Sequence, residues 1–196
     1  MSVSHPSRSP FTRTWWTWFA GFLAFPIAGV AGTAVAGRVD GPIAALVGGT
    51  VAGLVIGAAQ ALVSRRRLDP RRWIPATALG MGVGLLLGAS VVGYRTSLLD
   101  LALMGALTGA VLGPVQALAL PSGTPARWLW GAAMPVLWAS GWIATTLGGI
   151  SVQDQFTVFG AYGAITFSAL SGLLIGRLVP GRDPLTRVRV PMVVAS

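Results

Sequence analysis

Six long apolar stretches, each cut at 22 residues, alternate with short polar connections: 15–36, 42–63, 73–94, 98–119, 128–149 and 157–178. A helix of about 20 residues crosses the ~30 Å hydrocarbon core of a bilayer. Backbone in lipid must also satisfy its own hydrogen bonds, which favours helices over open strands. The pattern therefore predicts an all-α bundle of six transmembrane helices, with antiparallel neighbours because the connections are short.

Composition supports a membrane protein over a soluble domain. Hydrophobic residues make up 54% of the chain and charged residues only 10%, against about 25% charged in soluble domains. The chain has no cysteine, and its one histidine, His5, lies in the polar N-terminal segment. We therefore expect no thiol chemistry, no metal and no cofactor.

Arginine supplies all 14 basic residues and gathers on one side of the predicted bundle. Twelve fall in the N-terminal segment, the connections 64–72 and 120–127, and the C-terminal segment, whereas only Arg38 and Arg95 fall on the other side. The positive-inside rule then places both termini in the cytoplasm. The prediction is a cytoplasmic tail at 1–14, a transmembrane domain at 15–179 and a cytoplasmic tail at 180–196, in an inner (plasma) membrane.

Six tryptophans occur at the predicted cytoplasmic helix ends, a depth that indoles favour, and we expect them to anchor the interface. They are Trp15, Trp16, Trp18, Trp73, Trp128 and Trp130. Ala34-Val35-Ala36 resembles a signal-peptide cleavage site. The preceding apolar stretch is longer than the roughly 7–15 residues of a signal peptide, so we expect it to remain as a helix.

The second and fourth stretches share the pattern GxxxGxxxGxxQAL at an offset of 56 residues. The matched glycines and glutamines are Gly49, Gly53, Gly57 and Gln60, and Gly105, Gly109, Gly113 and Gln116. A weaker echo in the sixth stretch aligns Gly172 and Gly176 with Gly53 and Gly57, and Val179 with the glutamine. The hypothesis is a helical hairpin repeated in parallel, with the second, fourth and sixth helices packed together as an inner layer.

The repeated GxxxGxxxGxxQ segment precedes an arginine-rich turn and a tryptophan that opens the next helix (Trp73; Trp128 or Trp130). Over roughly residues 42–149 this resembles small multi-pass bacterial membrane proteins of unknown function, whose segments often end in Gln-Trp and Leu-Arg-Arg. Here Ala61 and Ala117 replace the tryptophan, and the second copy lacks the arginine run. The resemblance implies no activity.

Glycines four residues apart share one helix face and allow a second helix to approach closely. We expect the ridges to pack within the chain, with a homodimer seam as the alternative. Gln60 and Gln116 near the cytoplasmic ends form either a clamp between helices or a polar mouth to a solute path. Trp138 and Trp142 suggest packing or lipid contact, with a hydrophobic-ligand pocket as the alternative.

The connection after the second stretch holds the densest charge of the chain. We expect its arginines to set topology and to contact anionic lipid headgroups; they are Arg65, Arg66, Arg67, Arg71 and Arg72. On the opposite side, Arg95 and Asp100 are positioned to pair. Nucleic acid is not an expected partner, because membrane topology already explains the net charge of +9.

The sequence contains no recognisable catalytic set. Its hydroxyl groups have no histidine or lysine base nearby, and no carboxylate falls at mid-membrane, where ion-coupled carriers hold an ionisable group. We expect a non-enzymatic packing or scaffold protein, or an accessory membrane subunit with a membrane-protein partner or a second copy of itself. The alternative is a passive channel or uncoupled carrier for a small solute.

Overall fold

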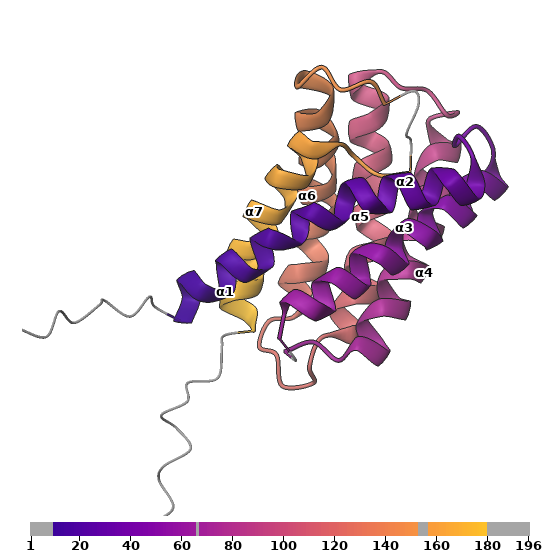
Figure 1. Ribbon diagram of the computed structural model, residues 1–196. Helices are drawn as coiled ribbons and strands as arrows, with labels where there is room; N and C mark the ends of the chain where they lie inside the picture. The colour runs from indigo at the N-terminus through magenta and orange to yellow at the C-terminus, as the bar shows by residue number, and fades with distance from the viewer. Residues whose placement is uncertain (1–9, 66, 153–156, 180–196) are drawn as a thin grey trace, which may run out of the picture.

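The computed structural model describes residues 10–65, 67–152 and 157–179, which form helices joined by short turns (Figure 1). The elements are α1 (Pro10–Phe19), η1 (Ala20–Leu23), α2 (Ala24–Ala36), α3 (Pro42–Val63), α4 (Pro70–Val91), α5 (Leu98–Ala119), α6 (Trp128–Leu147) and α7 (Ala161–Leu178). The predicted all-α class is confirmed. Arg66, residues 1–9 of the predicted N-terminal tail and the predicted tail 180–196 lie outside the described residues.

Five of the helical spans are long and apolar enough to cross a membrane: Phe11–Ala36, Pro42–Val63, Pro70–Val91, Leu98–Ala119 and Ala161–Leu178. These are the helices of an integral membrane protein. The sixth predicted span, α6, has 20 residues but is not among the five. Its four tryptophans and Pro135 lower its hydropathy.

The bounds of α3 and α5 coincide with the predicted stretches, and those of the other helices shift. α4 begins at Pro70 because Pro suits the first helical position and the Asp69 side chain caps the helix, accepting a hydrogen bond from the Arg71 N–H at 3.0 Å. Arg71 and Arg72 therefore belong to the first turn of α4 and not to a loop. α7 begins at Ala161, later than predicted.

The first span runs as one long tilted rod made of α1, η1 and α2 (Figure 1). The tighter turn at η1 precedes Pro26, which lacks an N–H and whose ring would crowd the Phe22 carbonyl of a regular α-helix. The rod crosses the bundle diagonally, so that α1 packs against α7 while α2 packs against α3.

The helices close into a ring in chain order, because each packs against the next and α7 returns to α1. The predicted inner layer is wrong. Among the described residues the backbones of α3, α5 and α7 do not come close to one another. A glycine ridge shows that some helix approaches closely but not which one, and in this ring α3 and α5 direct their ridges to the following helix.

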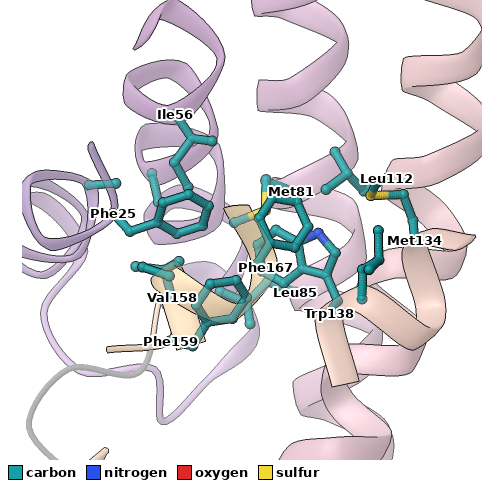
Figure 2. Packing of buried hydrophobic residues seen from close by; sticks show 14 of the residues in the cluster. Phe25, Ile56, Met81, Leu85, Leu112, Met134, Trp138, Val158, Phe159 and Phe167 are labelled. Atoms are coloured by element: carbon teal, nitrogen blue, oxygen red, sulfur yellow. The ribbon is translucent and has the colours of Figure 1, made fainter. Parts of the chain in front are cut away.

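Large apolar side chains fill the middle of the ring. Figure 2 shows side chains from α2 to α7 converging on one cluster, including Phe25, Met81, Leu112, Trp138 and Phe167. Each of these five side chains is at most 2% exposed. In the described part of the chain the ring therefore encloses packed side chains.

Candidate functional site

The glycines of α3 let the backbone of α4 approach directly. A Cβ added to Gly53 would lie 2.7 Å from the Thr77 carbonyl oxygen, and one added to Gly49 would lie 2.8 Å from that of Met81. Gly57 meets the Thr77 side chain at 3.0 Å. These distances leave no room for a side chain at the three positions.

The glycines of α5 face α6 in the same way. A Cβ on Gly105 would lie 2.5 Å from the Trp142 ring, and one on Gly113 would lie 2.5 Å from the Gly131 carbonyl oxygen. A Cβ on Gly109 would overlap the Met134 carbonyl. α4 meets α5 through a third ridge of its own: Gly80, Gly84 and Gly88.

Each repeated glutamine accepts a hydrogen bond from a tryptophan on the following helix. The Trp73 indole N–H donates to Gln60 Oε1 at 3.0 Å, and the Trp130 indole N–H donates to Gln116 Oε1 at 3.0 Å. Gln116 also donates to the Thr77 hydroxyl at 2.9 Å, which ties α5 to α4. Both amides are buried, at 4% and 1% exposure.

The two tryptophan partners are fully buried, which corrects part of the predicted interfacial belt. Trp73 and Trp130 are 0% exposed and Trp18 is 4% exposed, whereas Trp16 and Trp128 are about half exposed. Hydropathy places an indole near a helix end but does not distinguish lipid from the protein interior. A buried glutamine acceptor stabilises the interior position by pairing the indole N–H.

The seam between α7 and α1 repeats this arrangement with different residues. The Trp18 indole N–H donates to the Ser171 hydroxyl at 3.0 Å, and Trp15 donates to the Ala169 carbonyl at 3.0 Å. Ser171, and not Val179, is therefore the acceptor on α7. The sequence alignment missed this pair because serine replaces glutamine. Gly172 and Gly176 pack on Trp15 and Phe11 of α1.

The three buried indoles meet inside the ring and form what we call the tryptophan triad: Trp18, Trp73 and Trp130. Their ring centroids lie 5.8 Å (Trp18–Trp130), 5.9 Å (Trp73–Trp130) and 6.4 Å (Trp18–Trp73) apart, in edge-to-face or tilted geometry. Aromatic pairs favour these orientations. The triad fills the interior at the arginine-rich end, meaning the end with the connections 64–69 and 120–127.

The other half of the interior is filled by the segment 157–160, which precedes α7. Phe159 is 1% exposed and stacks on Phe25 at a centroid distance of 5.0 Å, beside Trp138 at 4.8 Å (Figure 2). Residues 157–160 were predicted to be helical and are not. Trp138 and Trp142 are each 1% exposed and pack inside the bundle.

A few buried polar atoms within the described residues lack a hydrogen-bond partner. They are the hydroxyls of Thr33 and Thr157 and the indole nitrogen of Trp138. Thr157 lies between α2 and α3, where a Cβ on Gly32 or Gly48 would collide with it. The Trp138 ring is surrounded by the apolar cluster of Figure 2.

The predicted arginine cluster divides in two. Arg71 and Arg72 are exposed on α4 next to Asp69, with 3.9 Å between Arg72 Nε and Asp69 Oδ2. Arg67 is partly buried, and this burial, together with the nearby charges of Arg65 and Arg13, lowers its pKa. Arg13 of α1, absent from the predicted set, joins this group.

At the opposite end the predicted pair is confirmed: Arg95 Nη2 lies 2.9 Å from Asp100 Oδ1. Both side chains are near the surface, so the contact contributes little to stability. Over residues 10–65, 67–152 and 157–179, no group of three His, Cys, Asp or Glu side chains is placed to hold a metal ion. What the arrangement offers is a set of directional hydrogen bonds between closely packed helices.

No family model matches the chain, and neither a curated protein nor a solved structure is significantly similar to it.

Proposed function

We propose that this integral membrane protein is non-catalytic and acts through packing, as a scaffold or accessory subunit of the inner membrane. The observation that carries the proposal is the closed interior of the ring. The tryptophan triad fills one half, and the stack of Phe159 on Phe25 fills the other. Such a body supplies fixed outer faces to a membrane-protein partner.

The glutamines support packing over permeation. Gln60 and Gln116 have their carbonyl oxygens bonded to indole N–H groups. A pore mouth needs amides that face water, whereas these two are buried. The channel or uncoupled carrier is therefore the alternative that the flux experiment below tests.

The proposal includes the origin of the ring as parallel helical hairpins. Its support is the sequence match between α3 and α5, and the indole acceptor that each places toward the next helix. Gly160, which precedes α7, and Ala164, Ser168 and Ser171 within α7 follow the same spacing as Gly49, Gly53, Gly57 and Gln60. With α1 as its partner, α7 would be the third unit.

Both termini are proposed to face the cytoplasm, on the strength of the arginine distribution. Reporter fusions at residues 40, 96 and 153 should read periplasmic, and those at 68, 124 and 190 should read cytoplasmic. Any one reversed reading contradicts the six-span arrangement, including the assignment of α6 as a span.

Flux through proteoliposomes tests whether the ring is closed. We expect glycerol and K⁺ permeation equal to that of protein-free vesicles. Flux above this level that falls in Gln60→Leu and Gln116→Leu, while the melting temperature holds, would establish a channel instead.

Photo-crosslinking in cells tests the scaffold role. A photoreactive residue is placed at exposed positions on different helices, at Ile43, Leu99, Val136 or Tyr162. We expect a discrete protein adduct from at least one position, and none from the buried control position Leu85. Lipid adducts alone at all four positions would contradict the proposal.

A further inference from the structure

Three arginines gather at the arginine-rich end, and within residues 10–65, 67–152 and 157–179 no carboxylate forms an ion pair with them. Arg13 lies on α1, and Arg65 and Arg67 lie in the turn after α3. The ion pairs within the described residues are Arg72–Asp69 and Arg95–Asp100, and neither includes these three. Burial and the charges of Arg65 and Arg13 lower the pKa of Arg67, as expected for a cation that lacks a counter-ion.

The nearest acid along the chain is already engaged. Asp69 accepts the Arg71 N–H at 3.0 Å as the cap of α4, and its second oxygen faces Arg72 at 3.9 Å. Asp69 is not among the causes of the Arg67 pKa shift, whereas Arg65 and Arg13 are. Within the described residues Arg67 therefore carries excess positive charge that can attract an external anion.

Arg67 also borders a small cavity between α1, the α3–α4 turn and the end of α7. Its volume is about 10 Å³, and Arg67, Thr14, Thr17 and Ser64 line it together with five apolar side chains: Trp18, Val63, Leu68, Ile175 and Val179. That volume is room for about one water-sized atom. The Thr17 hydroxyl donates to the backbone carbonyls of Arg13 and Thr14, and the Ser64 hydroxyl donates to that of Ala61. The Arg67 guanidinium is therefore the charged hydrogen-bond donor in the lining of this cavity.

We propose that this cavity is the floor of a binding site for a phosphate-class oxyanion. One anion oxygen enters the cavity beside Arg67, and the nearby charges of Arg13 and Arg65 stabilise the remaining oxygens. Guanidinium groups bind phosphate oxygens through charge-assisted hydrogen bonds. The ligand is either the phosphodiester of an anionic lipid or free phosphate. This assignment is independent of the proposed packing role.

The chain supplies a matched control, because Arg71 carries the same charge nearby but neither lines the cavity nor contributes to the pKa shift of Arg67. We propose to measure phosphatidylglycerol binding to the full chain in detergent by native mass spectrometry. Arg67→Gln and Arg13→Gln should each weaken binding about tenfold or more, because each removes a charge-assisted contact to the bound oxyanion. Arg71→Gln should change binding by less than about twofold.

Thermal melting of each variant without anionic lipid shows whether the fold is retained. Equal losses in Arg67→Gln and Arg71→Gln would mean diffuse attraction to the surface, and would overturn the site.

A second titration, with inorganic phosphate, identifies the source of the oxyanion. Displacement of phosphatidylglycerol by millimolar phosphate, lost in Arg67→Gln, indicates a site that accepts the free anion. Lipid binding that is sensitive to Arg67→Gln but unaffected by phosphate indicates a lipid headgroup site. If Arg67→Gln alters the binding of neither ligand, the proposal is wrong. The flux and crosslinking results do not bear on this outcome.

Discussion

The two glycine-lined hairpins, α3–α4 and α5–α6, are held together differently from the seam where α7 meets α1. In each hairpin, glycines meet the backbone of the next helix, and one indole–amide hydrogen bond joins the pair. At the seam, Gly172 and Gly176 meet aromatic rings, and two indoles of α1 donate to α7. Arg177 also lies over the Phe11 ring, at 5.5 Å from its centroid.

The difference follows from chain connectivity. The helices of a hairpin are joined by a short turn, so they are already close and van der Waals packing of backbones suffices to align them. The seam joins residues more than 150 positions apart along the chain. Directional hydrogen bonds fix its register where no turn does so. The hairpins should therefore respond most to steric changes, whereas the indole hydrogen bonds set the register of the seam.

The largest expected effect is steric and falls on the hairpins. Gly109→Leu and Gly53→Leu place a side chain against a backbone carbonyl of the next helix, so the helices must separate. We expect a loss of about 3 kcal/mol or more in each, at the upper end of overpacking effects, measured as a lower melting temperature in detergent. Gly123→Leu is the control, since nothing lies within 4 Å of its Cβ position. Parent-like melting of both variants would mean that these faces are not packed.

The second-largest expected effect is the loss of a buried indole N–H group. Trp130→Phe and Trp73→Phe leave a buried glutamine oxygen unpaired and also remove part of a fully buried ring, so we expect each to cost about 1–3 kcal/mol. Trp18→Phe should cost less, because the Ser171 hydroxyl can still donate a hydrogen bond to a carbonyl, whereas a glutamine oxygen can only accept. Unfolding in denaturant measures all three, with the exposed Trp128→Phe as control. If Trp18→Phe is the most damaging, the seam depends on this bond more than the hairpins depend on theirs.

The two hairpins should differ from each other in how much stability they lose when their glutamine is replaced. Gln116 bonds to both Trp130 and Thr77, whereas the Gln60 bond in the described structure is to Trp73. Gln116→Leu should cost about 1 kcal/mol and Gln60→Leu about half of that, in keeping with membrane hydrogen bonds. A double-variant cycle of Gln116→Leu with Trp130→Phe should show coupling. Additive losses would show that the bond contributes nothing to stability.

The smallest effect belongs to the seam acceptor. Ser171→Ala leaves the Trp18 N–H without its partner but keeps the small side chain, and we expect a loss of about 0.5 kcal/mol. Ser168→Ala, on the same helix, is the matched control, since no inter-helix bond is assigned to its hydroxyl. Equal melting curves for the two variants would place the strength of the seam in ring packing alone.

Sequence reasoning predicted the helices better than their partners. The bounds of α3 and α5 follow from apolar length, and Pro and Asp explain the start of α4. The order of the helices around the ring could not be predicted, because a glycine ridge shows that a helix packs closely there but not which helix it is. Burial of Trp73 and Trp130 was missed because an indole is equally suited to an interface and to a paired interior site. Nothing in the local pattern at Ser171 or Phe159 indicates their long-range contacts.

The closing seam also has a consequence for biosynthesis. The ribosome delivers the first span long before α7, so the indoles of Trp15 and Trp18 enter the membrane while their acceptors are still unsynthesised. The α3–α4 and α5–α6 hairpins each become complete as soon as their second helix emerges. A truncated or stalled chain that ends before residue 161 therefore carries two donors without acceptors on its first helix. These unpaired indole N–H groups would distinguish such a chain from the finished ring for membrane quality-control proteases.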